Sequence, residues 1–197
     1  MKKFLIVATV IFLAAFCVFG SGKFTAEKGQ YGVGASFGYS KSIENVFDKG
    51  ENLKLADDNK FGWVARARFD YMVADAKSIT VMASFDNPSK VLEAQTYALK
   101  EGQSDEKAAK FFMGYSTYTL KDNFIVGVGV GPELTWNIED HTIGGGPATY
   151  VKTSLMIPGT KLSLDSIAKG SAEWMKEGDA TRLYFDGDVS VGATYWF

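Results

Sequence analysis

The sequence predicts an all-β fold, specifically an eight-stranded antiparallel up-and-down transmembrane β-barrel. Three observations support this prediction. Apolar residues recur at every second position through most of the chain, which is the spacing of a strand with one apolar face. The segments with this pattern are separated by connections that alternate between long and short. The last segment ends on the aromatic residues Tyr195-Trp196-Phe197.

Residues 1–20 are predicted to be a cleaved signal peptide, which leaves residues 21–197 as a single barrel domain. Lys2 and Lys3 provide a positively charged start, and an almost uninterrupted apolar stretch follows them. That stretch is short against the roughly 20 apolar residues that a membrane-spanning helix needs. A lipid-modified Cys17 is the alternative, but the large Phe16 stands where a lipidation motif requires a small residue. We therefore expect export without lipidation.

The composition argues against several classes of function. A formal net charge of -2 creates no basic field, so nucleic acid is not an expected partner. A single cysteine excludes an intramolecular disulfide and a Cys-based metal cluster. The single histidine, His141, removes the usual zinc and His-dependent catalytic arrangements. We expect neither a cofactor, nor a metal, nor enzymatic activity.

The first three predicted strands alternate most clearly. Residues 31–39 and 61–71 each place large apolar side chains on one face and small, polar or charged ones on the other. The third strand follows at residues 78–85. In each case one face suits lipid and the other suits a polar interior.

Five further strands complete the count. They are predicted at 110–120, 124–131, 148–157, 162–167 and 182–197. The strand at 110–120 is aromatic on both faces, so its orientation stays open. Eight strands is the smallest common size of a transmembrane barrel.

The connections give an independent indication of the topology. Long connections are predicted at 41–59, 87–109, 132–147 and 169–181, and short turns at 73–76, 121–123 and 158–160. Transmembrane barrels have short turns on one side of the membrane and longer loops on the other. A soluble β-sandwich has no reason to sort its connections in this way.

The last strand contains a spaced motif. Ser190, Gly192, Tyr195 and Phe197 follow the order polar, any, Gly, any, any, aromatic or apolar, any, aromatic. This motif resembles the assembly signal of bacterial outer-membrane proteins, and the mature chain is similar in size and strand count to small OmpA/OmpX-type and OmpW-type barrels. The resemblance implies recognition by the barrel-assembly machinery, insertion among outer-membrane lipids, and both termini in the periplasm. It transfers no functional residue.

Charged residues fall on the predicted inner face. They are Arg66, Arg68, Asp70, Lys152, Asp165, Arg182, Asp186 and Asp188. Positive and negative charges are equal in number in this set, and the interior of so narrow a barrel has room only for side chains. Because an unpaired buried charge is very costly, these residues are expected to pair. We predict a sealed lumen charge network in preference to an Arg–Asp gate within a channel.

Other inward and interfacial residues leave alternatives open. Inward glycines such as Gly127 and Gly129 either make room for long side chains or leave a cavity. Met82 and Ile125 face inward and could line an apolar pocket for a hydrophobic solute. Phe111, Met113 and Tyr115 would join them if the strand at 110–120 turns these residues toward the interior. Aromatic girdles at the membrane interfaces are predicted to include Tyr31, Tyr39, Trp63, Tyr71, Tyr118 and Trp136.

The predicted function is a structural or surface-interaction role, adhesin-like, in the outer membrane of the cell envelope. The loops would be surface-exposed and would contact a host or cell-surface ligand, because loops on a rigid scaffold commonly carry binding. The alternative is a porin-like small channel, or a transporter of small or hydrophobic solutes of the OmpW type.

Overall fold

The computed structural model describes residues 26–47, 54–87, 107–139, 141–177 and 180–197 of the 197-residue chain. The predicted signal peptide lies outside these ranges. Within them, no helix has the length and apolar character needed to cross a membrane.

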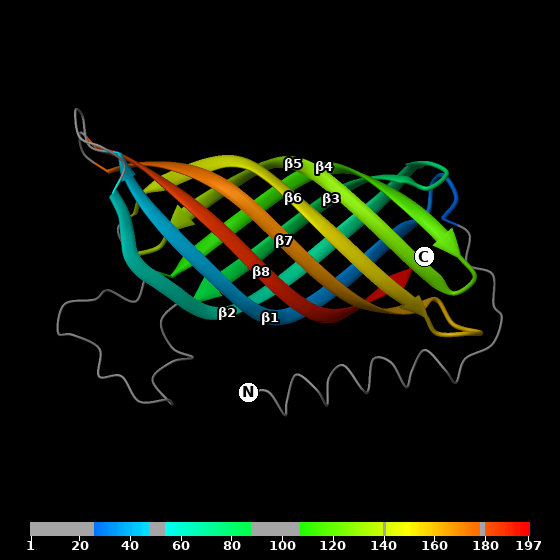
Figure 1. The fold of residues 1–197 in the computed structure, drawn as a ribbon. Helices are drawn as coiled ribbons and strands as arrows, with labels where there is room; N and C mark the ends of the chain where they lie inside the picture. Colours follow the sequence, from blue (N-terminus) through cyan, green and yellow to red (C-terminus); the bar gives the residue numbers. More distant parts are fainter. Residues whose placement is uncertain (1–25, 48–53, 88–106, 140, 178–179) are drawn as a thin grey trace, which may run out of the picture.

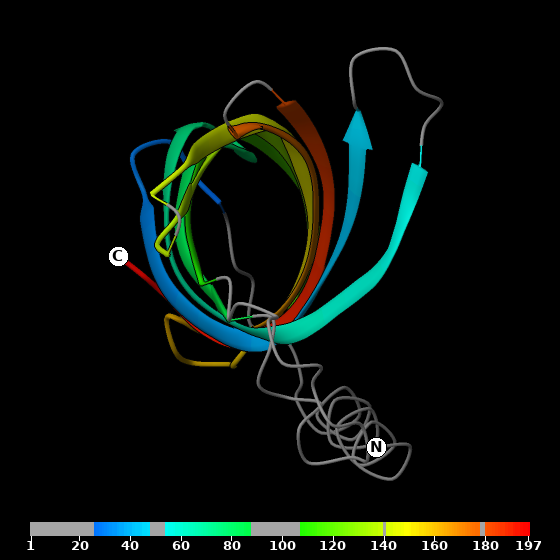
Figure 2. The ribbon, with the colours of Figure 1, turned by 90° about the vertical axis from the view of Figure 1, so that its left-hand side faces the viewer.

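Eight antiparallel strands form a closed barrel, as the sequence predicts (Figure 1). The strands are β1 (Tyr31–Phe47), β2 (Lys54–Ala74), β3 (Lys77–Asn87), β4 (Ala108–Lys121), β5 (Phe124–Asn137), β6 (Ile143–Met156), β7 (Leu162–Glu177) and β8 (Ala180–Trp196). Each strand pairs with its neighbours in the chain, and β1 pairs with β8 to close the ring, which Figure 2 shows in a view along the barrel from the end that lies on the left in Figure 1.

The two ends of the barrel differ. At the end that we call the turn end, the strands are joined by residues 75–76, 122–123 and 157–161, and the described chain both starts and finishes there. At the opposite end, the loop end, the connections are residues 48–53, 88–107, 138–142 and 178–179. In Figure 1 the turn end lies on the right.

The long connections were predicted too long. The segment predicted as a loop at 169–181 is mostly strand, because β7 continues to Glu177 and pairs with β8 up to Ala180. The segment predicted at 132–147 also pairs along most of its length, with Glu133 opposite Gly146 in the β5–β6 register. β1 and β2 likewise extend into the connection predicted at 41–59. The strands therefore extend further at the loop end than the sequence pattern predicts.

The orientation of β4 is clear. Phe111, Met113 and Tyr115 are each about half exposed on the outside, at 47%, 52% and 48%, so they do not line the interior. Phe112 and Tyr118 point inward and are buried. The placement of Tyr118 in an aromatic girdle was therefore wrong, because its phenol is needed for hydrogen bonds inside the barrel. Of the other girdle candidates, four are exposed on the outside and Trp63 is partly buried there.

An apolar cluster closes the turn end. We call it the turn-end cluster, and it consists of Ala26, Met72, Tyr118, Ile125, Met156 and Trp196. The segment before β1 contributes Ala26, whose carbonyl accepts a hydrogen bond from the Ala76 N–H at 3.0 Å. The same segment pairs with the end of β2, since the N–H of Met72 donates to the Gln30 carbonyl at 2.9 Å. A second cluster of Met82, Phe112, Ala148, Tyr150 and Ile167 lies further inside.

Candidate functional site: the charged lumen

Arg68 occupies the centre of the lumen and joins three strands. Its Nε lies 2.9 Å from Asp70 Oδ2, and its Nη2 lies 3.0 Å from Asp165 Oδ2. The same Nη2 donates to Thr194 Oγ1 at 2.6 Å. The guanidinium thus connects β2, β7 and β8 within a site where its side chain is only 2% exposed.

Lys152 completes this central ion cluster, which consists of Arg68, Asp70, Lys152 and Asp165. The Lys152 ammonium lies 3.5 Å from Asp165 Oδ2 and 3.9 Å from Asp70 Oδ2. It also lies 5.1 Å from the ring centroid of Trp196, in cation–π range. Two cations facing two anions make the cluster neutral, which suits complete burial.

Hydroxyl groups extend the central cluster toward β3 and β4. Asp70 Oδ1 accepts hydrogen bonds from Thr80 Oγ1 at 2.7 Å and from the Tyr118 hydroxyl at 3.2 Å. The Tyr150 hydroxyl lies 2.6 Å from Ser116 Oγ and 3.0 Å from Thr80 Oγ1. The phenols therefore belong to the polar network although their rings pack with apolar residues.

Two glycines make room for these phenol rings. A Cβ added at Gly127 would lie 2.6 Å from Tyr118 Cδ1, and one added at Gly129 would collide with the Tyr150 ring. The inward Gly127 and Gly129 therefore make room for long side chains and do not leave a cavity, because the rings of Tyr118 and Tyr150 occupy the space beside them.

Two simple ion pairs lie nearer the loop end. Arg66 Nη2 is 2.6 Å from Asp188 Oδ1, and Arg66 Nη1 donates to Ser190 Oγ at 3.0 Å. Lys169 on β7 pairs with Glu133 on β5 in a short charge-assisted hydrogen bond. Each pair is internally neutral.

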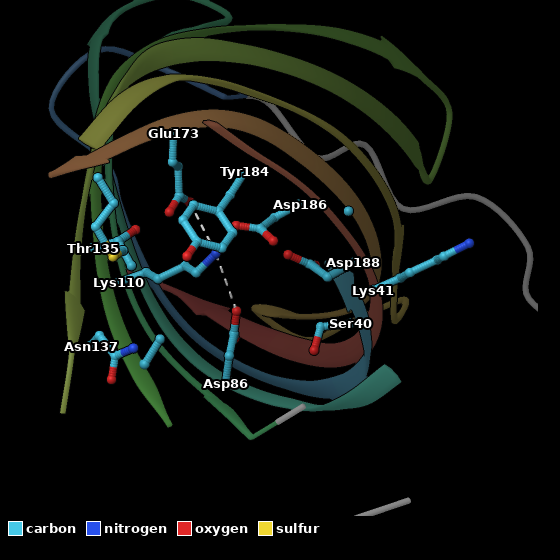
Figure 3. A pocket seen from close by; sticks show the side chains of 13 residues that line it. Ser40, Lys41, Asp86, Lys110, Thr135, Asn137, Glu173, Tyr184, Asp186 and Asp188 are labelled. Carbon is cyan, nitrogen blue, oxygen red and sulfur yellow. Dashed lines mark hydrogen bonds and ion pairs between the residues drawn. The ribbon is translucent and has the colours of Figure 1, made fainter. Parts of the chain in front are cut away.

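Lys110 forms the outermost charge cluster. Its ammonium lies 2.6 Å from Asp186 Oδ2, 2.9 Å from Glu173 Oε1 and 3.6 Å from Asp86 Oδ2 (Figure 3). These side chains line a partly open recess with a volume of about 60 Å³, which we call the loop-end recess. Its other lining residues include Thr135, Tyr184 and Asp188.

The structure brings most of the sequence-predicted lumen residues into contact. Arg66, Arg68, Asp70, Lys152, Asp165 and Asp188 form ion pairs with one another. Asp186 pairs with Lys110, a partner that sequence reasoning missed. Arg182 lies in β8, and its side chain is outside the described part.

Sequence reasoning missed five inward charges. They are Asp86, Lys110, Glu133, Lys169 and Glu173. The inward parity of Asp165, continued along β7, also gives Lys169 and Glu173, but the sequence pattern predicts a loop in that stretch.

The expected balance of charges is corrected as well. The inner face of the described residues carries five cations (Arg66, Arg68, Lys110, Lys152 and Lys169) and seven anions (Asp70, Asp86, Glu133, Asp165, Glu173, Asp186 and Asp188). The difference is two negative charges, and it falls in the loop-end recess, where three carboxylates surround Lys110.

The residues of the predicted assembly signal point in two directions. Ser190 faces the lumen and accepts a hydrogen bond from Arg66, while Gly192 lies close to the backbone of β1. Tyr195 and Phe197 face outward, and the Phe197 ring stacks on Tyr31 with 4.6 Å between centroids. These contacts join β8 to β1, and the role of the motif in assembly stays a prediction.

No group of three or more metal-ligating side chains occurs among the residues that the structure describes. His141 is exposed and lies in the connection between β5 and β6. Its sequence neighbour Asp140 is outside the described ranges.

Comparison with known proteins identifies the fold. No protein-family model and no curated protein sequence matches the chain. Among solved structures, Neisserial surface protein A superposes with a TM-score of 0.60 at 11% identity, covering 85% of this chain and 99% of that one. The fold is that of a small outer-membrane β-barrel.

A second solved structure supports the same conclusion. The outer membrane protein OprG from Pseudomonas aeruginosa matches with a TM-score of 0.52 at 10% identity, covering 87% of this chain and 97% of that one. The predicted resemblance to small bacterial outer-membrane barrels is thereby confirmed at the level of the fold. Identities this low carry no functional residue across.

Proposed function

We propose that the protein is a closed, non-conducting outer-membrane barrel that acts at the cell surface through its loop end. One observation carries this proposal. The interior is packed with apolar side chains at the turn end and with paired charges through its middle, while a recess opens toward the loop end. Such an interior supports a binding role rather than passage through the barrel.

The packing of the lumen argues against both forms of transport. A hydrated ion path would leave charged groups in contact with water, yet Asp70 and Lys152 are 0% exposed. A carrier of hydrophobic solutes needs an open apolar pocket, but Met82 and Ile125, the inward candidates, are each 2% exposed and belong to packed clusters. The closed barrel is therefore the better supported alternative.

The orientation follows from the connections. In outer-membrane barrels the short turns face the periplasm and the longer connections face outward. The turn end, with its two-residue turns at 75–76 and 122–123, then faces the periplasm. The longest connection, residues 88–107, would face outward and would be available to a host or cell-surface ligand. The resemblance to a protein named as a surface protein favours the same location.

Replacement of residues 88–106 by a short Gly-Ser linker tests the surface role. Cells that produce the intact protein should adhere to cultured animal cells or to one another, and cells with the shortened protein should lose this adhesion. Both forms should show heat-modifiable migration on gels, because β3 up to Asn87 and β4 from Ala108 are left unchanged. A matched linker inserted at 157–161, on the turn end, should leave adhesion intact.

Full adhesion by the shortened protein would contradict the proposed role of this connection. If the shortened protein fails to fold, a soluble peptide of residues 88–106 provides a second test. The peptide should compete with intact cells for adhesion, and absence of competition would count against the proposal.

A further inference from the structure

The loop-end recess contains more negative charge than its own cation neutralises. Asp86, Glu173 and Asp186 surround the single ammonium of Lys110. Asp188 is neutralised separately by Arg66. Lys41 also belongs to the lining, but its side chain extends away from Lys110 in Figure 3. Among the described side chains, two carboxylate charges are thus left in a recess that is partly open to solvent.

Two buried polar atoms in this recess have neither a hydrogen-bond partner nor an ion-pair partner among the described residues. Thr135 is 3% exposed and its Oγ1 makes no hydrogen bond, and Asp86 is 8% exposed with an Oδ1 that makes none. Both residues line the recess. Buried polar groups are almost always paired, so these two atoms are available to a further partner, which for the carboxylate must be a donor.

An ammonium group matches this arrangement. It carries one positive charge and three donors and needs no acceptor. Lys110 demonstrates that the neighbouring carboxylates of Asp186 and Glu173 accept an ammonium, at 2.6 and 2.9 Å. The described residues provide no set of three ligands for a metal ion. The recess is small, so only the head group and a short alkyl chain would fit beside Lys110.

We propose that the loop-end recess binds the primary ammonium group of an alkyl amine, with Asp86 Oδ1 and Thr135 Oγ1 as its contacts. This inference names a ligand class for the loop end and rests on the proposed function only for the outward orientation of the recess. Binding by purified protein is measured separately from adhesion and conductance, so the two proposals fail independently.

Calorimetric titration of the refolded full-length barrel with propylamine and with 1,4-diaminobutane tests the inference. Saturable binding is expected that weakens as salt is raised, because the contacts are charged and near the surface. Tetramethylammonium, which has the same charge but no N–H donor, should bind at least about tenfold more weakly, since it cannot form the charge-assisted hydrogen bond.

Substitutions with matched controls locate the site. Asp86→Asn should weaken propylamine binding at least about tenfold, whereas Asp122→Asn, the same change in an exposed turn at the other end, should not. Lys110→Met should strengthen binding, because the amine replaces the resident ammonium. Lys107→Met removes the same charge from a residue that is not part of the recess lining and should have no effect.

The source of the ammonium is distinguished by a second ligand. We would titrate a short peptide that contains one lysine, and the same peptide acetylated at that lysine, beside propylamine. Binding of propylamine, of the unmodified peptide or of both would support an ammonium site and would identify the source of the ammonium group. No saturable binding of any amine by the folded protein would overturn the inference. Equal weakening by Asp86→Asn and Asp122→Asn would do the same, because it would reveal only a general charge effect. Heat-modifiable migration verifies that each variant is folded.

Discussion

The Arg68 guanidinium shows at the scale of one residue why the lumen is closed. Transfer of a single charge into a packed interior costs several kcal/mol, and only a well-placed partner offsets this cost. Arg68 has two carboxylate partners and a hydroxyl acceptor, all within 3.0 Å. Because the partners come from different strands, the pairs also fix the register across the barrel.

Replacement of Arg68 by methionine should lower the free energy of unfolding by about 3–5 kcal/mol. The reason is that Asp70 and Asp165 would be left with Lys152 as their nearest cation. Urea unfolding in lipid vesicles, followed by tryptophan fluorescence, measures the change. Lys107→Met is the control, since Lys107 is 39% exposed and its pair with Glu139 spans 3.7 Å; its effect should stay below about 1 kcal/mol. Equal effects of the two substitutions would contradict the account of the central cluster.

A glycine beneath a tyrosine ring allows an equally local prediction. Gly129→Ala should destabilise the barrel by about 1–3 kcal/mol, because the added methyl group displaces the Tyr150 ring and its hydroxyl contacts. Gly170→Ala is the matched control, as its methyl would meet only the Asp186 carbonyl at 3.8 Å. The same unfolding measurement compares the two substitutions. An unchanged free energy of unfolding for Gly129→Ala would contradict the prediction, because it would show that the Tyr150 ring can move aside without loss of stability.

At the scale of the strand, the sequence pattern predicted the membrane-facing parts well and the loop-end parts poorly. Val128 and Val130 mark the outer face of β5 plainly, but Pro132 interrupts the pattern, since proline is normally confined to strand ends and edges. In the register Pro132 lies opposite Pro147, and the strands continue beyond both. In β7 the outward residues Ala168, Gly170 and Ala172 are small, so no apolar stripe indicated a strand.

The clarity of the apolar alternation also explains which inward charges the sequence predicts. Arg66, Arg68 and Asp70 alternate with apolar residues that identify the outer face, so their inward position could be deduced. Glu133 and Glu173 lie in the extensions where that marking is weak. Their pairing with Lys169 and Lys110 depends on which strands become neighbours across the lumen, and alternation along one strand holds no such information.

Hydrogen exchange tests the extended strands. The amides of residues 133–136 and 143–146 should exchange slowly, because they pair across β5 and β6. Amide exchange measured by mass spectrometry or NMR on the protein in vesicles separates these stretches from Glu139 and His141, which are exposed in the connection. Rapid exchange throughout 132–147 would show that this segment is a loop, as the sequence pattern predicts, and would contradict the extended strands.

At the scale of the whole molecule, the barrel is asymmetric. The turn end is closed by apolar side chains that include Trp196 from the last strand, whereas the loop end holds the excess negative charge of the described side chains. The final strand β8 takes part at both ends. It closes the ring by pairing with β1, it supplies Trp196 to the turn-end cluster and charged side chains to the lumen, and it contains the predicted assembly signal.

Deletion of Phe197 separates assembly from stability. In cells the shortened chain should yield much less folded barrel, if the terminal aromatic residue is recognised by the assembly machinery. In detergent the purified chain should still fold with heat-modifiable migration, because Phe197 contributes only one stacking contact with Tyr31, one edge-on contact with Tyr195 and one backbone hydrogen bond to Tyr31. Normal amounts in the outer membrane would contradict the assigned role of the motif.

Conductance across a planar lipid bilayer tests the closed lumen most directly. Purified protein inserted in bilayers in concentrated KCl should give no steady or discrete current, because apolar side chains and paired ions occupy the interior. A large porin added to the same bilayer controls for detection, and recovery of heat-modifiable protein from the membrane verifies insertion. Discrete openings of the wild-type barrel that change when Arg66 or Arg68 is replaced would show that the charge network gates a pore and would contradict the account.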